Sequence, residues 1–319
     1  MLSDATLEQR LVRVVSIRKA AIDTLRLELA PADRRPLAPF TAGAHIDVLA
    51  PSGQVRQYSL CGDPRDASRY AIAIKREAQG RGGSRSMHDD VEEGSALGIH
   101  EPRNHFPLAE NATHSLFIAG GIGITPIHAM IQSLHTGGHS WELHYCARSA
   151  AHAAFHDELV ALGGPRVTPW FSEKPILDVH ALLRDAPEGT HLYCCGPSGL
   201  MSAVKAAASH WPRERVHFEY FAAPAHVDSP NRRFEVELRR SGLVLEVPPE
   251  RTLLQVLREH GIEVESSCEE GVCGTCETRV LDGACEHRDF LLSDAEREAS
   301  KSMMVCVSRA RSPRIVLDL

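Results

Sequence analysis

The sequence predicts three consecutive parts: an antiparallel β-barrel, an open parallel α/β sheet, and a small α+β domain that carries a metal cluster. The first part is rich in short strand and turn patterns, the second alternates strands with helices, and the third holds four cysteines at metal-ligand spacing. A chain of 319 residues is long enough for two or three domains. We therefore predict domains at 1–106, 107–226 and 227–319.

The first part consists of strand-like segments separated by turns. Residues 11–17, 24–29 and 70–75 alternate apolar with polar side chains or run apolar over the length of a strand. Proline and glycine turns fall between such segments, at 51–53 and 62–64. This pattern is typical of a small antiparallel barrel.

The second part alternates strands with helices. An apolar strand at 116–119 ends in glycines, and an apolar helix begins near Pro126. Further strands are predicted at 141–146, 167–171 and 191–194. Alternation of this kind predicts an open parallel α/β sheet.

The third part follows a proline-rich polar linker at 222–231. Two strands are predicted at 233–238 and 243–247, and a helix at 253–260 has Thr252 as its N-cap. The cysteine-rich loop comes next. The cluster is therefore expected on a small α+β domain.

The composition is that of an ordinary soluble protein, with 43 % hydrophobic and 24 % charged residues. No apolar run approaches the roughly 18 residues of a membrane span, and the first residues lack a signal-peptide pattern. We expect a cytoplasmic protein with no membrane partner. The net charge of −7 argues against a nucleic-acid partner.

The negative charge is concentrated in the third part, where 18 Asp and Glu face 13 Lys and Arg. Several of these glutamates surround the cysteine-rich loop. Two interpretations stay open: a solvated acidic face, or a surface that docks a basic redox partner.

Four cysteines carry the strongest chemical signal. Cys268, Cys273 and Cys276 form a C-x4-C-x2-C motif, and Cys306 follows after 29 residues. This is the ligand spacing of a plant-type [2Fe–2S] cluster, which carries one electron at a time. A redox pair or half of a zinc site would also use the C-x2-C. Zinc sites usually take two short pairs, however, and Cys306 has no nearby partner.

A flavin site is suggested by Arg56, Gln57, Tyr58 and Ser59. The motif offers a cation for a phosphate, an aromatic face for the ring and a hydroxyl for a polar edge.

A second element supports this site, because Gly82, Gly83 and Ser84 stand at a predicted helix start. Backbone N–H groups in such a turn bind a phosphate. The alternative is a flexible glycine loop.

A nucleotide site is suggested where the first strand of the α/β part turns into its helix, at Gly120, Gly121 and Gly123. Glycines at such a turn let the backbone approach a pyrophosphate. The third glycine of the dinucleotide-binding fingerprint is absent. The later turn Cys195-Gly196-Pro197, again between strand and helix, would place a thiol beside the nicotinamide.

Taken in this order, the motifs resemble the phthalate dioxygenase reductase family, the reductase components of Rieske non-haem iron oxygenases. Vanillate demethylase reductases are similar. The resemblance covers nearly the whole chain. It implies a flavin-binding barrel, a nucleotide-binding domain of the ferredoxin-reductase type, and a C-terminal plant-type ferredoxin domain with the β-grasp fold.

The resemblance also implies roles for single residues. The Gly82–Ser84 loop is similar to the family's FMN phosphate loop, which favours FMN over FAD. Arg56 and Lys75 would be the cations around that FMN. Ser59 would lie near the ring, and Tyr58 would cover it. The implied cofactor-binding set is Arg56, Gln57, Tyr58, Ser59, Ile74, Lys75, Gly82, Gly83, Ser84, Gly120, Gly121, Gly123, Thr125, Pro126, Cys195, Gly196, Pro197 and Phe221.

At the reacting centre, Thr125 and Cys195 match family positions next to the nicotinamide. Glu219 and Phe221 match an acidic and aromatic pair that closes over the flavin, although Phe221 as a core residue is an equal alternative. The expected catalytic residues are thus Ser59, Thr125, Cys195 and Glu219. No role is assigned to Cys194.

The implied function is electron transfer from NADH through FMN and the [2Fe–2S] cluster to a terminal Rieske oxygenase. The sequence leaves the oligomeric state open, and we expect a monomer by default. Arg148, after the predicted strand at 141–146, leaves NADPH as the lesser alternative. The alternative function is a stand-alone reductase of a quinone, a ferric chelate or a haem protein. A non-enzymatic cluster module is a further alternative, which the flavin and nucleotide motifs disfavour.

Overall fold

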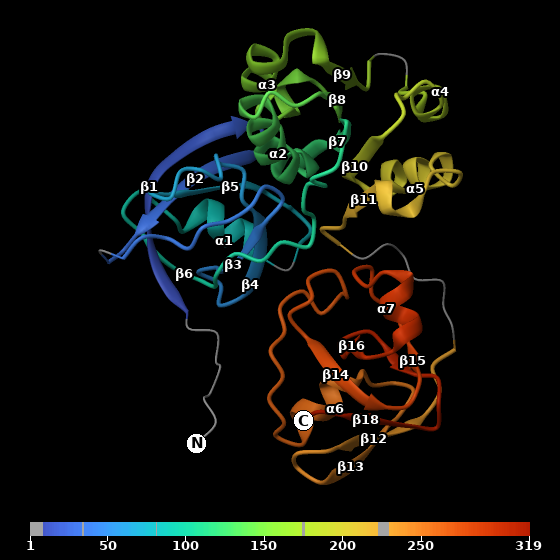
Figure 1. Cartoon of the computed structure of the whole chain (residues 1–319). Coiled ribbons are helices and arrows are strands. Elements are labelled where there is room, and N and C mark those ends of the chain that lie inside the picture. Colours follow the sequence, from blue (N-terminus) through green and yellow to red (C-terminus); the bar gives the residue numbers. More distant parts are fainter. Residues whose placement is uncertain (1–8, 34, 81, 174–175, 223–229) are drawn as a thin grey trace. The chain divides into compact units, whose positions relative to one another are not determined.

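The computed structural model describes residues 9–33, 35–80, 82–173, 176–222 and 230–319. Its internal contacts divide the chain into two compact units, Met1–Glu219 and Tyr220–Leu319, which we call the N-terminal and C-terminal units (Figure 1). Three predictions fall outside the described residues: the lack of a signal peptide at 1–8, most of the linker, and the domain boundary at 226/227.

The N-terminal unit begins with six antiparallel strands in the order β4-β3-β6-β1-β2-β5. A bridge between Leu60 and Ile72 joins the ends of this order. The sheet thereby closes into the predicted barrel, whose interior is filled by valine, leucine and isoleucine. The strands are β1 (Arg10–Ala21), β2 (Thr24–Pro31), β3 (His45–Leu49), β4 (Val55–Ser59), β5 (Tyr70–Lys75) and β6 (Ala96–Ile99), and the helix α1 is Gly83–Asp89.

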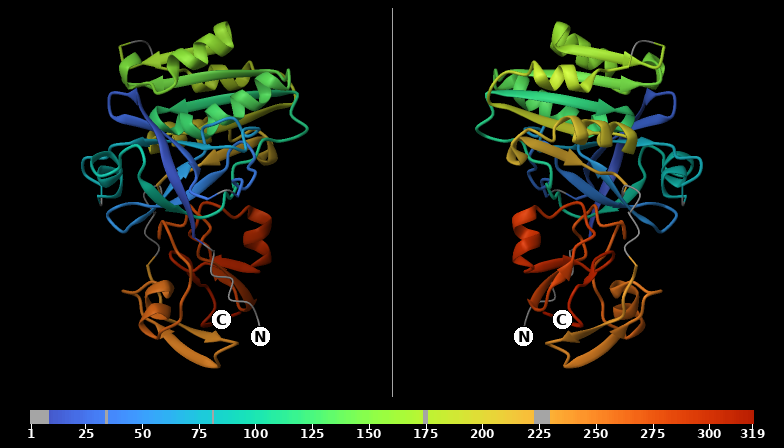
Figure 2. Two further views of the ribbon diagram at one scale, coloured as in Figure 1. Left: turned by 90° about the vertical axis from the view of Figure 1, so that its left-hand side faces the viewer. Right: turned by 90° about the vertical axis from the view of Figure 1, so that its right-hand side faces the viewer.

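The same unit continues with five parallel strands in the order β11-β10-β7-β8-β9. The strand order reverses after β9, and right-handed crossovers then place α2 and α3 on one side of the sheet and α4 and α5 on the other (Figure 2). The elements are β7 (His114–Gly120), η1 (Gly121–Gly123), α2 (Ile124–Thr136), β8 (Trp141–Ala147), η2 (Ala150–His152), α3 (His156–Gly163), η3 (Gly164–Arg166), β9 (Val167–Phe171), α4 (Val179–Arg184), β10 (Thr190–Cys195), α5 (Ser198–Ala207), η4 (Arg213–Arg215) and β11 (Val216–Glu219).

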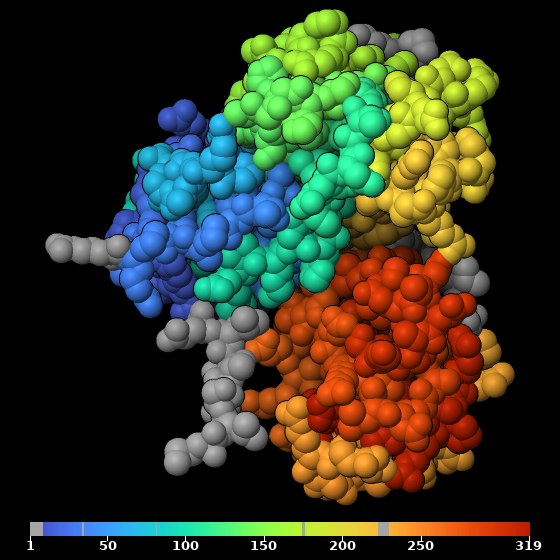
Figure 3. Space-filling model, in the orientation of Figure 1, coloured from blue at the N-terminus to red at the C-terminus, as the bar shows by residue number. Residues whose placement is uncertain are grey.

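The barrel and the parallel sheet share a core. Barrel residues such as Cys61 are buried in one cluster with Ile127 and Met130 of α2. The Nδ1 atom of the buried His128 lies 2.7 Å from the carbonyl oxygen of Cys61. Phe106 is buried in the same cluster, so the predicted division at 106/107 falls between two sheets that pack as one unit. Figure 3 shows their surfaces as continuous.

The C-terminal unit is a mixed sheet in the order β13-β12-β18-β14-β16, covered by α6. β12 and β18 are parallel, and the other neighbours are antiparallel. This is the predicted small α+β domain. Its elements are β12 (Phe234–Leu238), β13 (Leu243–Val247), α6 (Leu253–Glu259), β14 (Glu277–Asp282), β15 (Cys285–Glu286), α7 (Asp294–Ala299), β16 (Ser302–Met304), β17 (Arg309–Ala310) and β18 (Arg314–Leu317).

The start of α6 confirms the predicted N-cap. The Thr252 hydroxyl accepts from the backbone N–H of Gln255 at 3.1 Å, and the Gln255 side chain accepts from the backbone N–H of Thr252 at 2.9 Å. This reciprocal capping box satisfies two N–H groups that the helix cannot pair internally. Throughout the described chain, every helix is too short or too polar to cross a lipid bilayer.

Candidate functional site

The flavin-site residues of β4 are positioned by its pairing with β3. Ile46 lies opposite Tyr58 and His45 lies opposite Ser59. Because side chains alternate along a strand, Tyr58 shares a face with Arg56 and packs against the barrel core, whereas Ser59 points from the other face. The motif therefore offers its ring and its hydroxyl from opposite faces at the end of one strand.

Several polar atoms at this strand end are buried without a partner in the described structure. They are the Tyr58 hydroxyl, the Ser59 hydroxyl and both ring nitrogens of His45. Burial raises the pKa of Tyr58 to about 12, and burial followed by the Arg103 charge lowers the pKa of His45 to about 4. Buried polar groups are normally hydrogen-bonded. These neutral groups fit the polar edges of a flavin ring.

Gln57 has a partner within the protein. Its amide donates to the Asp47 carboxylate at 3.0 Å, and Arg103 donates to the same carboxylate at 2.7 Å. Burial tends to raise the pKa of Asp47, but Arg103 and the hydrogen bonds outweigh burial and lower it. Gln57 thus belongs to a buried network that the sequence did not suggest, and its contact with a cofactor stays a prediction.

The residues predicted to bind a phosphate lie together at the start of α1. Gly82 precedes the helix with a φ of 104°, a left-handed conformation that favours glycine. A Cβ on Gly83 would lie 2.8 Å from Nε of Arg56, so the guanidinium packs across the helix start. The sequence pattern thus brings Arg56 and the glycine loop together, as the phosphate hypothesis requires.

Lys75 and Ser84 are linked through Glu77, a residue that sequence reasoning missed. The Lys75 ammonium lies 2.7 Å from the Glu77 carboxylate, and the Ser84 hydroxyl accepts from the backbone N–H of Glu77 at 3.1 Å. Ile74, next to Lys75, is fully buried in the barrel. A phosphate at this loop would therefore compete with Glu77 for Lys75.

The two glycine-containing turns of the parallel sheet pack back to back. A Cβ on Gly123 would lie 2.3 Å from the carbonyl oxygen of Cys195, and one on Gly120 would lie 2.5 Å from Pro197. A Cβ on Gly196 would lie 2.9 Å from Gly120. Such distances exclude any side chain.

This packing revises the physical reason for the glycines. The sequence predicts Gly120, Gly121 and Gly123 as room for a pyrophosphate, but contact between the two turns requires Gly120 and Gly123, and also Gly196. Gly121 differs: its φ is 53° and a Cβ there would meet no atom within 4 Å. Within the pair of turns, Gly121 is the glycine with open space for a ligand.

The predicted nicotinamide residues come from three adjacent strand ends. Thr125, near the start of α2, is buried and donates its hydroxyl to the carbonyl of Ile122 at 2.9 Å. Pro126 is the third residue of the same helix. Cys195 ends β10, opposite Ala119 of β7 and Glu219 of β11. The structure thus brings Thr125, Cys195 and Glu219 to one edge of the sheet.

Cys195 and Glu219 are both held in their uncharged forms. Burial, then the Glu219 carboxylate and Cys194, raises the pKa of the Cys195 thiol well above its ordinary value. Burial raises the pKa of Glu219 to about 8. A neutral thiol and a protonated carboxyl therefore border this edge near pH 7. The neighbouring Cys194 is buried against Met201, which gives it a packing role.

Glu219 leads to a prediction about pH. The unfolded chain loses this proton near 4.5, whereas the folded protein keeps it until about pH 8. Stability should therefore fall as pH rises between these values and level off above them. We expect the thermal midpoint, followed by flavin fluorescence, to decline across this window less steeply in Glu219→Gln than in the wild type. Equal slopes would contradict burial of the carboxyl.

Phe221 lies in the C-terminal unit and is 46 % exposed. The alternative prediction, in which Phe221 is a core residue, is therefore wrong. Phe218, in β11, is half-buried. The closing of Phe221 over a flavin stays a prediction.

The four predicted cluster ligands lie in the C-terminal unit, where Cys273, Cys276 and Cys306 are buried and Cys268 is partly exposed. Their thiols are close enough to influence one another. The neighbouring Cys268 thiol lowers the pKa of Cys273 to about 5, and the neighbouring Cys306 thiol lowers the pKa of Cys276. The same neighbours, together with burial, raise the pKa of Cys268 and of Cys306. Four neighbouring thiols match a binuclear centre, which needs two thiolates for each iron.

The loop that carries the first three ligands is tightly wound. Glu269, Gly271 and Gly274 have φ values of 58°, 72° and 76°. The two glycines were predicted to enable this path, whereas a left-handed glutamate has no clear sequence signal. The backbone N–H of Glu270 donates to the Cys268 sulfur at 3.3 Å. Such N–H groups tune the potential of a cluster. Among the described residues, no three His, Cys, Asp or Glu side chains converge as a single metal ion would need.

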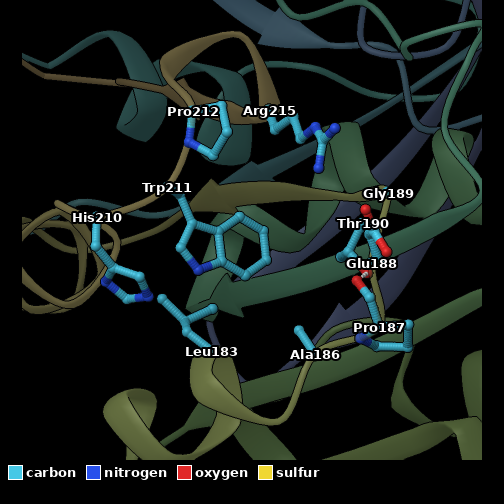
Figure 4. A pocket seen from close by; sticks show the side chains of 10 residues that line it. All are labelled: Leu183, Ala186, Pro187, Glu188, Gly189, Thr190, His210, Trp211, Pro212 and Arg215. Carbon is cyan, nitrogen blue, oxygen red and sulfur yellow. Dashed lines mark hydrogen bonds between the residues drawn. The ribbon is translucent and has the colours of Figure 1, made fainter.

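A surface hollow of about 220 Å³ lies apart from these groups (Figure 4). It is lined by Trp211, Arg215 and the turn before Thr190. Thr190 begins β10 and Cys195 ends it. The hollow is therefore at the opposite edge of the sheet from the glycine turns and takes no part in the site.

Comparisons with known proteins indicate a [2Fe–2S] cluster in the C-terminal unit. A model described as "2Fe-2S iron-sulfur cluster binding domain" matches residues 236–311, and one described as "Dimethylamine monooxygenase subunit DmmA-like, N-terminal domain" matches 101–214. The chain is 45 % identical over 321 residues to "Phenoxybenzoate dioxygenase subunit beta" of Ectopseudomonas oleovorans, covering 100 % of both chains.

Two further similarities also span the chain. "Vanillate O-demethylase oxidoreductase" of Pseudomonas sp. is 46 % identical, over 97 % of this chain and 99 % of the relative. A solved structure of phthalate dioxygenase reductase, described as modular for electron transfer from pyridine nucleotides to [2Fe–2S], matches with a TM-score of 0.73. It is 41 % identical and covers 98 % of each chain.

Proposed function

Because the chain belongs to the phthalate dioxygenase reductase family, we propose that it takes electrons from NADH and passes them through a flavin and a [2Fe–2S] cluster to a partner oxygenase. The observation that carries this proposal is the C-x4-C-x2-C spacing of Cys268, Cys273 and Cys276 with Cys306 beyond it, inside the region that matches a 2Fe-2S cluster binding domain. The two relatives described above belong to oxygenase and demethylase systems, so the alternative of a stand-alone reductase is not favoured.

A bound flavin would accept two electrons as a hydride and release them singly, which matches a two-electron donor to a one-electron cluster. Ser59 and Tyr58 would hold the ring edge through hydroxyls that have no partner in the described protein. Arg56 and Lys75 would neutralise a phosphate at the Gly82–Ser84 loop. This single compact phosphate site supports FMN as the flavin.

Thr125, Cys195 and Glu219 would border the nicotinamide. Their side chains are uncharged near pH 7, since the thiol and the carboxyl both keep their protons. An uncharged edge can position the reacting ring without supplying a base that would take up a proton. Hydride transfer needs no general acid or base, so positioning is the main contribution of these residues.

The partner follows from the relatives. Their names include a phenoxybenzoate dioxygenase and a vanillate demethylase system, both acting on aromatic acids. We infer that the partner is a Rieske-type oxygenase of an aromatic acid or its methyl ether, and that it docks transiently. A cytoplasmic, monomeric protein is part of the same proposal.

An anaerobic NADH titration followed by absorbance and EPR tests the whole route. We expect bleaching of the flavin, then a rhombic signal from the reduced [2Fe–2S] cluster, and FMN in an acid extract. Flavin reduction without the EPR signal would overturn the cluster. FAD in the extract would overturn only the choice of flavin.

The phosphate assignment is tested by Arg56→Ala. A charge-assisted hydrogen bond contributes about 1.5–3 kcal/mol, so we expect FMN to bind about 10- to 100-fold more weakly. The measurement is the flavin dissociation constant, from fluorescence on release. Arg65→Ala is the control, since Arg65 is an exposed barrel arginine that pairs with Asp63. Unchanged retention in Arg56→Ala would remove the assignment.

A further inference from the structure

We propose that residues 287–292, which we call the strap, tie together the two segments that carry the cluster ligands, and that Asp289 and Arg297 are the residues that position the strap. The first segment holds Cys268, Cys273 and Cys276, and the second holds Cys306. The inference rests on the proposed cluster. It goes beyond that proposal because it assigns roles to residues that are not ligands.

The strap contacts both segments. The backbone N–H of Phe290 donates to the carbonyl of Gly271 at 2.9 Å, between the first two cysteines. The backbone N–H of Arg288 donates to the hydroxyl of Ser308 at 3.2 Å, just after Cys306. Ser308 is buried, so this second contact is shielded from water. The strap therefore bridges the two sides of the cluster site.

The contact at Gly271 is too close for any side chain. A Cβ there would lie 3.1 Å from Cα of Asp289 and 2.6 Å from Cγ2 of Val307. Gly271 is thus enclosed by the strap on one side and by the Cys306 segment on the other. The three pieces of chain meet at one point directly beside the ligands.

Asp289 organises the strap from inside. It is 2 % exposed, and its Oδ2 accepts from the backbone N–H groups of Leu291 at 3.2 Å and Leu292 at 2.9 Å. The same oxygen accepts from Nη2 of Arg297 at 3.2 Å. Its Oδ1 is buried and lies 3.7 Å from Nδ1 of His287. A buried carboxylate with these partners fixes the turn of the strap.

Arg297 fixes the strap to helix α7. Its Nη2 donates to the carbonyl of Asp289 at 2.5 Å, and its Nε donates to the carbonyl of Leu292 at 2.8 Å. The helix is itself held at its start by a capping box between Ser293 and Glu296. Since α7 leads through β16 to Cys306, the arginine couples the strap to the fourth ligand.

The consequence concerns Cys276 and Cys306, which come from different segments. Their separation depends on how firmly the segments are tied, whereas Cys268 and Cys273 share one loop. Residues that orient metal ligands typically contribute 10- to 100-fold to metal affinity. Loosening the strap should therefore release the cluster and shift its potential without touching the flavin site.

The test compares Arg297→Gln and Asp289→Asn with the wild-type holoprotein. Iron release to a chelator should be about 10- to 100-fold faster in both variants. The EPR-monitored potential of the cluster should also shift, and NADH–ferricyanide activity should be unchanged. Arg297→Lys keeps the positive charge but lacks the planar guanidinium with its several N–H donors. This variant should therefore retain only part of the wild-type resistance to iron release. Asp282→Asn is the matched control, because Asp282 is exposed on β14 of the same unit.

Two outcomes are decisive. If Arg297→Gln releases iron at the wild-type rate and has the wild-type cluster potential, the proposed role of the strap is overturned. This variant is informative even if Asp289→Asn does not fold, since the Arg297 side chain is partly exposed. A wild-type protein without any reduced-cluster EPR signal would instead overturn the proposed function.

Discussion

A Cys273→Ser variant is expected to lose NADH-dependent cytochrome c reduction while it keeps NADH–ferricyanide reduction. Serine removes the sulfur whose pKa is lowered to about 5, and a hydroxyl does not replace it as an iron ligand. Loss of a residue that only hydrogen-bonds a metal ligand typically lowers metal affinity or activity about 10- to 100-fold. Loss of a ligand itself should therefore lower cytochrome c reduction at least about 100-fold. Ferricyanide accepts electrons directly from the flavin, whose proposed site lies in the N-terminal unit.

The matched control is Cys285→Ser. Cys285 is buried in the same unit, and burial raises the pKa of its thiol to about 11. The Cys285→Ser substitution makes the same chemical change as Cys273→Ser without removing a predicted cluster ligand. Stopped-flow traces with both acceptors measure the two routes in one preparation. Loss of both activities in Cys273→Ser would mean that the flavin site depends on the cluster unit.

The second large effect is expected from Gly123→Ala. The added methyl group would lie 2.3 Å from the carbonyl oxygen of Cys195, so the two turns must separate. Overpacking of this kind typically costs about 1–3 kcal/mol of stability. It should also displace Cys195 and Thr125 and slow flavin reduction by NADH. A difference of 1 Å in the placement of reacting groups typically costs about 100-fold in rate.

Gly199→Ala provides the comparison within the same region. Gly199 lies in helix α5, and a Cβ there would meet nothing within 4 Å. Alanine favours a helix over glycine by about 0.5–1 kcal/mol, so this variant should be as stable as the wild type or more so. Rapid-mixing measurements of flavin reduction and the unfolding midpoint would separate the two variants. Wild-type kinetics in Gly123→Ala would show that the turns are not rigidly opposed.

The sequence allowed the fold to be predicted where local patterns decide it. The strand at 116–119, the helix after Pro126 and the cap at Thr252 all depend on periodicity or on neighbouring residues, and the structure confirms each of them. The spacing of the four cysteines is equally local, apart from Cys306. The later strands of the C-terminal unit are short, and β15 and β17 have two residues each. Such elements have no period to detect.

The rest of the site depends on partners that are distant in sequence. Arg103 reaches Asp47 across 56 positions, and Gly123 meets Cys195 across 72 positions. Neither residue type signals its partner, because Arg–Asp pairs and glycine turns are common everywhere. The motif at 56–59 indicated a flavin, but only the three-dimensional structure shows that Gln57 has a protein partner.

The shared core of the barrel and the parallel sheet has a consequence for protein engineering. Since Cys61 and His128 bond across that core, a gene cut at the predicted 106/107 boundary would expose apolar surface on both fragments. A cut after Glu219 would leave each compact unit whole. Chimaeras that exchange the last hundred residues with another member of the family should therefore retain their pyridine-nucleotide chemistry and acquire a new choice of electron acceptor.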